Sequence, residues 1–220
     1  MTPTSPARRP VRRIGRKTGP KPSFTVDDVV DAALEIGIAR FTLARVAKRI
    51  GVSTSAVYRL FDSRDDLVHA CLARGAASME WPNGNSESWQ EVLREWAESS
   101  WEVCERYPGL DEVLFTFPGA FRHVQGVARS LIESLRGFGF TEPQALFALD
   151  FIGDTVISTH LSISALRNQG EDGRTGFEQV VADAREDDAF KPQESWIGRG
   201  FLDAKLDFII AGLEERRPEV

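Results

Sequence analysis

Hydrophobic and polar positions recur along most of the chain with the spacing of an α-helix. The first clear case follows Thr25, a residue type that caps helices, and its apolar positions run from Val26 to Leu34. Asp28 lies three residues after Thr25, where a carboxylate stabilises the start of a helix. Gly37 follows the last apolar position, so the first helix is predicted to end there.

Two shorter helices are predicted next, with a tight turn between them. Thr42 is expected to cap the first, Gly51 to supply the positive φ of the turn, and Ser53 to cap the second. The inner face of the second helix is predicted to carry Ala56, Val57, Leu60 and Phe61. Its outer face offers Thr54, Ser55, Tyr58 and Arg59, all able to form polar contacts. This arrangement is typical of a helix-turn-helix.

The rest of the chain also has helical spacing and no β-rich runs. After a fourth helix capped by Ser63, helices are predicted over residues 88–107, 110–117, 120–136, 141–167 and 201–213. Residues 141–167 are apolar on nearly every side, so this helix must be buried on more than one face. The acidic stretch 170–198 is expected to be mobile, with one short helical turn. The predicted fold class is all-α, with a three-helix N-terminal head and a helical C-terminal domain.

Charge divides the chain in two. Residues 1–64 hold 13 Lys or Arg and 5 Asp or Glu, a net charge of +8, whereas the remainder holds 14 and 28, a net charge of −14. Residues 1–22 contain five prolines and no acidic residue, so they are expected to form a disordered basic arm. We expect a head over residues 23–72 and a second domain over 73–220. A polyanion partner for the basic part is favoured, and a basic tail without a partner is the alternative.

Several classes of protein and site find no support in the sequence. Cys71 and Cys104 are too few for a disulfide framework or a zinc site, and no metal or cofactor is expected. No run approaches ~18 uninterrupted apolar residues and no signal peptide is apparent, so a cytoplasmic protein without a membrane partner is expected. His123 and His160 could form an acid–base site with Asp150 or Asp154, but no catalytic motif accompanies them. We therefore expect no enzyme.

The head resembles the tetracycline-repressor (TetR) family of bacterial regulators. The resemblance rests on Phe41-Thr42-Leu43, Val46-Ala47, Gly51-Val52-Ser53, Val57-Tyr58, Phe61 and Leu67. A weaker likeness to the tetracycline-repressor branch lies in Ser88-Trp89-Gln90, Arg106-Tyr107, Gly139-Phe140 and Ala145-Leu146. The resemblance implies an all-α homodimer with a DNA-binding head and a ligand-binding, dimerising body. Its dimer interface would use the helices at 141–167 and 201–213.

The resemblance also implies DNA-contacting residues. Thr54, Ser55 and Ala56 would face base edges in the major groove, while Thr42, Tyr58 and Arg64 would hold phosphates. Leu60 and Ala44 depart from the family pattern, which leaves Thr54, Ser55 and Arg59 as the expected base readers. The arm could enter the minor groove or only raise general DNA affinity. Together the expected DNA-binding residues are Thr42, Ser53, Thr54, Ser55, Ala56, Tyr58, Arg59 and Arg64, with Arg12, Arg13, Arg16, Lys17 and Lys21 of the arm.

A ligand pocket is expected among the aromatic helices of the body. Asp150 and Asp154 need partners, either a cationic ligand or an arginine across the dimer interface. By position Trp96, Ser100 and Leu114 match ligand-facing sites of the tetracycline-repressor branch. Leu114 and Ser162 replace its metal-binding groups, which argues against magnesium–tetracycline. The expected pocket comprises Trp96, Ser100, Leu114, Phe117, Phe121, Phe147, Phe151 and Asp154.

The function expected from the sequence is a one-component transcriptional repressor. It would bind a palindromic operator in double-stranded DNA as a homodimer and be released by an unidentified small molecule. A nonspecific DNA-binding protein that uses the basic arm, or a regulator without an effector, is the alternative.

Overall fold

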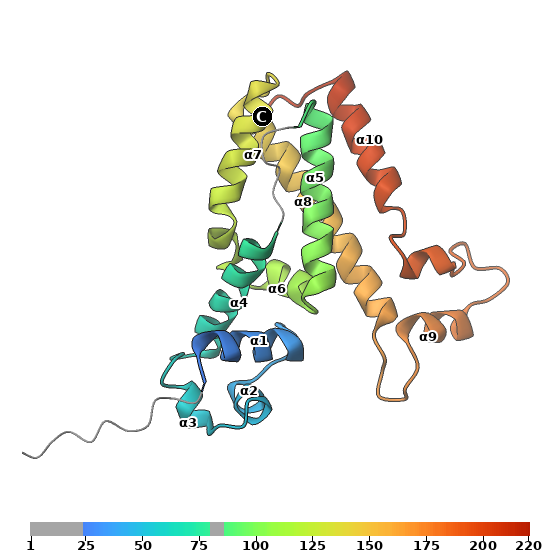
Figure 1. The fold of residues 1–220 in the computed structure, drawn as a ribbon. Helices are drawn as coiled ribbons and strands as arrows, with labels where there is room; N and C mark the ends of the chain where they lie inside the picture. Colours follow the sequence, from blue (N-terminus) through green and yellow to red (C-terminus); the bar gives the residue numbers. More distant parts are fainter. Residues whose placement is uncertain (1–23, 80–85) are drawn as a thin grey trace, which may run out of the picture.

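The computed structural model describes residues 24–79 and 86–220, and every regular element within them is helical. The predicted all-α class is therefore confirmed. Helices α1, α2 and α3 form a small head at the bottom of Figure 1, and α4 leads from it into a body built around α5, α7 and α8. The basic arm, with its five expected DNA contacts, lies outside the described residues, so its disorder and its role remain predictions.

The helices of the head begin where the sequence predicts. They are α1 (Val26–Ile36), α2 (Leu43–Arg49), α3 (Thr54–Val57) and α4 (Arg64–Ser78). The Thr25 hydroxyl accepts the Asp28 amide hydrogen while the Asp28 carboxylate accepts from the Thr25 amide, so both groups cap α1. Gly37 ends α1 with φ of +102°, which favours glycine.

Helix α3 is shorter than predicted, because it ends at Val57 instead of continuing to Phe61. The chain goes on in a tighter turn, in which the Leu60 amide donates to the Val57 carbonyl three residues before it. This tighter turn changes the direction of the side chain, and Leu60 is 39% exposed. The prediction that Leu60 is buried was wrong, whereas Ala56, Val57 and Phe61 are buried as expected.

The body contains the predicted long helices, with two differences. Its main elements are α5 (Trp89–Arg106), α6 (Leu110–Thr116), η1 (Ala120–His123), α7 (Gln125–Gly137), α8 (Glu142–Arg167) and α10 (Leu202–Glu215). The helix expected over 120–136 is divided at Val124 into a 3₁₀ turn and α7. The stretch 170–198 has more regular structure than expected, namely α9 (Gly176–Asp183) and η2 (Glu194–Ile197), because Thr175 and Glu178 cap α9 reciprocally.

Helix α8 is the central helix of the body and packs against α5, α7 and α10. By length and composition alone it could cross a membrane, since its most apolar window has a mean hydropathy of 1.3. In this fold, however, 44% of that window is buried against other helices. A core helix of a soluble protein passes the same test, so the finding is weak evidence for a membrane span.

Two apolar clusters organise the described residues. One contains the cores of α1–α4 and extends to Val103, Leu110 and Ala120 of the body. The other joins α5, α7, α8 and α10, with Leu93, Ile152 and Leu202 at its centre. Because α4 runs through residue 72 to Ser78, the expected domain boundary at this point remains a prediction.

Candidate nucleic-acid interface and ligand cavity

The outer face of the helix-turn-helix presents most of the polar side chains that the sequence predicts. Ser55 and Arg59 are exposed, Thr54 is partly exposed, and Tyr58 is 52% exposed. The Ser53 and Ser55 hydroxyls lie 3.0 Å apart in a mutual hydrogen bond. These side chains follow one short helix and its extension, so they form a single surface from which hydroxyl and guanidinium groups can donate hydrogen bonds.

Two expected roles do not fit the geometry. Ala56 is 6% exposed and lies on the inner face of α3, so its methyl group cannot lie against base edges. The helical period places Ala56 beside Val57 on the inner face, while Ser55 points outward. Ser53 precedes α3, but its side chain forms no capping hydrogen bond because it pairs with Ser55 instead.

Thr42 lies at the start of α2 with an exposed side chain. Its Oγ1 accepts a hydrogen bond from the Arg45 amide at 3.2 Å, which caps the helix. The hydroxyl hydrogen is not used in that bond, so Thr42 can cap α2 and donate to a phosphate oxygen at the same time.

Arg64 has a different environment from the one expected of a phosphate ligand. Its guanidinium donates to the carbonyl oxygens of residues 38, 39 and 41 over 2.9–3.3 Å. It also lies 4.9 Å from the centre of the Phe41 ring. These contacts join α4 to the segment between α1 and α2, so the structure favours a positioning role for Arg64.

The same segment is held from the other side by the turn between α5 and α6. The Ile38 amide donates to the Pro108 carbonyl at 3.1 Å. Gly109 has φ of +82°, and a Cβ at this position would lie 2.9 Å from the Ala39 Cβ. The turn at 108–109 therefore contacts the head directly, and only glycine fits its closest point of approach.

Sequence reasoning left two exposed cations of α2 without a role, Arg45 and Lys48. Arg45 donates to the Arg40 carbonyl at 3.2 Å. Arg45 lies between buried positions of α2 and Lys48 directly follows the last of them, so the helical period was the signal that could have identified both as surface cations of the helix-turn-helix.

A cavity of about 890 Å³ lies among α4, α5, α6, α7 and α8. Five of the eight expected pocket residues line it, namely Trp96, Ser100, Leu114, Phe121 and Asp154. Sequence reasoning missed further polar lining residues, among them Arg129, Glu133 and Arg136, and it left Asp150 between two interpretations. Their spacing of three or four residues along α7 and α8 was the available signal, but the sequence does not show which helix face meets the cavity.

The other three expected pocket residues lie elsewhere. Phe117 packs against the apolar cluster of the head and touches the His69 ring. Phe147 and Phe151 are exposed on another face of α8, with ring centres 5.8 Å apart. These three residues were assigned from aromatic character alone, and aromatic side chains also fill cores and interfaces.

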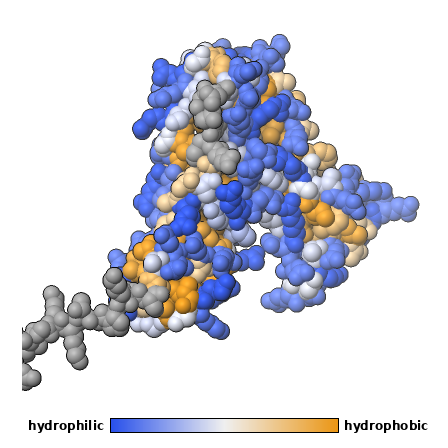
Figure 2. Space-filling view, viewed as in Figure 1, coloured by the Kyte–Doolittle hydropathy of each residue, from blue (hydrophilic) through white to orange (hydrophobic). Residues whose placement is uncertain are grey.

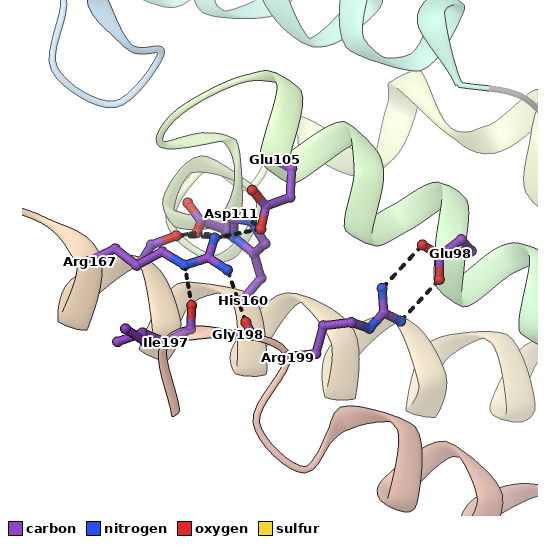
Figure 3. Close-up of polar contacts among 9 residues, drawn as sticks. Glu98, Glu105, Asp111, His160, Arg167, Ile197, Gly198 and Arg199 are labelled. Atoms are coloured by element: carbon purple, nitrogen blue, oxygen red, sulfur yellow. Dashed lines mark hydrogen bonds and ion pairs between the residues drawn. The ribbon is translucent and has the colours of Figure 1, made fainter. Parts of the chain in front are cut away.

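A buried polar cluster ties α6 to α8 and α5, as Figure 3 shows. The Asp111 carboxylate lies 2.7 Å from Nδ1 of His160, and the Ser164 hydroxyl donates to it at 3.0 Å. Burial by itself raises the pKa of Asp111, but hydrogen bonds from His160 and the Glu112 amide outweigh it, so the net shift is downward. At the rim Arg167 donates to Glu105 at 2.6 Å.

This cluster contains an aspartate, a histidine and a serine, but its geometry is not that of a hydrolase triad. Both Asp111 and Ser164 approach the same ring nitrogen of His160, Nδ1. Among the described residues, Nε2 of His160 is buried without a hydrogen bond and lies 3.6 Å from Glu105. No serine hydroxyl of the described chain faces Nε2, so the contacts present are those of a structural tie between helices.

A second pair of histidines joins α4 to η1. Nδ1 of His69 lies 3.0 Å from Nε2 of His123. Burial lowers the pKa of His123, and the nearby charges of His69 and Arg122 lower it further. At least one ring must therefore be neutral for this contact to form as a hydrogen bond.

Comparison with known proteins agrees with this arrangement. Residues 30–71 match the family of bacterial regulatory proteins named the tetR family. The chain is 27% identical to the HTH-type transcriptional repressor DrrR1 of Streptomyces coeruleorubidus, over 96% of this chain and 84% of that protein.

Solved structures share the fold. A TetR variant from Acinetobacter baumannii AYE in complex with minocycline has a TM-score of 0.62 at 22% identity, over 88% of this chain and 96% of that one. ActR of Streptomyces coelicolor in complex with actinorhodin has a TM-score of 0.64 at 18% identity, over 90% and 99%. The helix-turn-helix head therefore belongs to the TetR family of bacterial regulatory proteins, the chain is similar to an HTH-type transcriptional repressor over nearly its whole length, and the solved structures share its fold.

Proposed function

We propose that this regulator is a repressor that binds a palindromic operator as a homodimer and releases it when a small molecule enters the body. The observation that carries the proposal is the combination of an exposed polar face on the helix-turn-helix with a cavity of about 890 Å³ in the body. In this function the protein catalyses no reaction, and it binds DNA in the cytoplasm.

The DNA contacts divide into two kinds. Thr54, Ser55 and Arg59 read base edges, because they lie on the exposed face of the second helix of the motif. Thr42 and Tyr58 hold phosphates, and residues 1–22 add electrostatic affinity. Deletion of the arm is expected to reduce the salt dependence of binding by roughly 0.9 in log–log slope for each phosphate that the arm neutralises.

The dimer forms through α8 and α10. Figure 2 shows a largely hydrophilic surface with scattered apolar areas, so an exposed row of phenylalanines needs an explanation. Phe147 and Phe151 of α8 are exposed, as are Phe208 of α10 and Phe201, which directly precedes that helix. A shallow hollow of about 400 Å³ between the two helices is lined by Phe151 and Phe208. A second copy of the chain covers this face, and the two heads then meet successive major grooves.

Release follows from unequal affinity of the small molecule for two arrangements of the heads. The cavity is bounded on one side by α4, which begins in the head, and on another by α6, which directly follows the turn at 108–109 that contacts the head. The complexes of ActR with actinorhodin and of TetR with minocycline support a small-molecule effector for a protein of this fold.

The test is a competition gel-shift with DNA from upstream of the protein's own gene. We expect one palindromic site to bind ~10³-fold or more tightly than unrelated duplex. Equal affinity for every duplex would contradict the proposal and would favour nonspecific DNA binding through the basic arm.

A further inference from the structure

The cavity has one acidic wall, formed by a single face of α8. The residues of α8 that line the cavity are Leu149, Asp150, Gly153, Asp154 and Ile157. Their spacing of three or four residues places them along one stripe of the helix. The exposed Phe151 precedes Asp154 by three residues, so Asp154 lies at the border between the cavity and the proposed dimer interface, whereas Asp150 lies nearer the middle of the cavity stripe.

Neither carboxylate has a partner of opposite charge within the described part of the chain. No Lys, Arg or His nitrogen lies within 4.0 Å of either group there. Burial raises the pKa of Asp154, and the charge of Asp150 raises it further. Two adjacent carboxylates in this position repel each other, and a bound cation would relieve the repulsion.

Ser100 adds an independent indication of a ligand. This residue is 4% exposed and lines the same cavity from α5. Its hydroxyl oxygen is buried without a hydrogen-bond partner among the described residues. An unsatisfied buried polar group destabilises the fold, so a ligand that hydrogen-bonds to Ser100 recovers part of that loss.

Trp96 supplies an apolar wall one helical turn before Ser100. Its indole Nε1 donates to the Leu149 carbonyl at 2.9 Å, which fixes the ring against α8. The position opposite is Gly153, where a Cβ would lie 3.6 Å from the indole, so the ring and the helix backbone approach closely. Because the indole N–H is already used, Trp96 offers a ligand the apolar surface of its ring.

The remaining charges of the cavity lie mainly on α7. Arg129, Glu133 and Arg136 line that wall, and Glu142 and His123 lie at other edges. The arginines form no ion pair with Asp150 or Asp154 within 4.0 Å, so they do not neutralise the α8 wall in the described structure. The α7 wall therefore carries both positive and negative side chains, whereas the α8 wall carries only carboxylates, so a cation fits best against α8.

We propose that the effector is an organic cation with a flat apolar ring system. The rings lie against Trp96, a protonated nitrogen pairs with Asp150 and Asp154, and a polar group hydrogen-bonds to Ser100. This inference rests on the proposed function, because it specifies the chemistry of the small molecule that enters the same cavity.

The experiment compares two probes of equal ring size, the cation 9-aminoacridine and the neutral acridone. Binding to the full chain is measured by titration calorimetry without DNA, because both flat molecules could also bind the duplex. We expect the cation to bind about tenfold more tightly, which corresponds to one charge pair in a partly solvated cavity. In the double variant Asp150→Asn with Asp154→Asn, this preference is expected to disappear.

The controls separate the charge effect from general damage. Asp187→Asn removes an exposed carboxylate outside the cavity and should leave the preference for the cation unchanged. Ser100→Ala should weaken the binding of both probes. Thermal unfolding of each variant checks that it folds, and the asparagine variants should fold well because they remove a repulsion.

The inference is overturned if wild type binds both probes equally, if it binds neither, or if the asparagine variants keep the preference. These results would leave the proposed function standing when the gel-shift still finds a specific operator. Conversely, a cation preference in a protein that binds no specific operator would overturn the repressor proposal alone.

Discussion

At the scale of single residues, the same side-chain type serves different purposes in the head. Arg59 is exposed on the surface proposed for base reading, whereas Arg64 donates to three carbonyl oxygens of the segment between α1 and α2. A phosphate ligand changes the salt dependence of DNA binding, and a positioning residue changes protein stability. These two properties can be measured separately.

Arg64→Ala should therefore lower stability by about 1–3 kcal/mol, since it leaves the carbonyl oxygens without their charged donor. Operator affinity should fall because the head is less well held, while the slope of log affinity against log salt stays unchanged. Denaturant unfolding and gel-shifts at several salt concentrations provide the two readouts. A slope reduced by roughly 0.9 would instead identify Arg64 as a phosphate ligand. Arg59→Ala is the matched control and should leave stability nearly unchanged.

His123 makes stability depend on pH. Its pKa in the folded protein lies below the ordinary value of 6.5, so the unfolded chain binds the proton more readily. The associated stability is present above pH 6.5 and is lost as the pH falls from that value through the lower pKa of the folded state. Between pH 7.5 and pH 5.5 the free energy of unfolding should fall less for His123→Gln than for wild type, as measured by denaturant unfolding. An equal loss in both proteins would show that other groups carry the dependence.

At the scale of elements, the turn between α5 and α6 is a direct contact between body and head. Gly109 combines a positive φ with a backbone approach to Ala39 that leaves no room for a Cβ. Gly109→Ala should therefore destabilise the protein by about 1–3 kcal/mol, as measured by thermal or denaturant unfolding. Gly126→Ala is the control, because Gly126 lies in α7 with open space around it and should tolerate the methyl group. Equal effects of the two substitutions would contradict this account.

The tie between α6 and α8 depends on a buried charge. Asp111→Asn should cost about 2–4 kcal/mol at neutral pH, because the amide cannot replace the carboxylate beside His160. The pKa of Asp111 is lowered in the folded state, so the carboxylate contributes stability above its ordinary value of 3.8 and loses it as the pH falls through the folded value. The difference between wild type and variant should accordingly shrink toward pH 3. Exposed Glu112→Gln is the control, for which we expect little change at either pH.

At the scale of the whole molecule, the exposed phenylalanines of α8 and α10 govern assembly in our proposal. Phe208 is 81% exposed in one chain. In a symmetric dimer each substitution occurs twice, so Phe208→Asp should weaken association by about a hundredfold or more. Sedimentation or light scattering over a dilution series measures the change. Phe190 is 85% exposed but lies outside α8 and α10, and Phe190→Asp should leave the dimer intact. If Phe208→Asp leaves the dimer as intact as Phe190→Asp does, this interface is contradicted.

Much of the helical architecture could be predicted because it depends on local chemistry. The caps at Thr25, Thr42, Ser63 and Thr141 and the turn at Gly37 involve residues within a few positions of each other. Leu60 was misplaced because a tight turn replaced the last turn of a regular helix and left Leu60 exposed. The sequence pattern assumes 3.6 residues per turn and cannot register such a change.

The candidate sites could be predicted only in part. Periodicity correctly distinguishes exposed Ser55 and Arg59 from buried Val57, because the faces of one helix follow from its own spacing. It does not show which face of α8 meets α5 and which remains open, so Phe147 and Phe151 were assigned to the cavity while Asp150 was left between two interpretations.

The sequence by itself determined the fold class, the starts of the helices capped by Thr25, Thr42, Ser63 and Thr141, the helix-turn-helix and the division of charge between a basic N-terminal part and an acidic body. These features depend on composition and on interactions between near neighbours along the chain. Only the tertiary structure decided that Arg64 holds a loop, that Asp111 ties α6 to α8, and that Asp150 and Asp154 face a cavity. Each of these contacts joins residues far apart in sequence, and their geometry is set by helix packing, which local patterns do not contain.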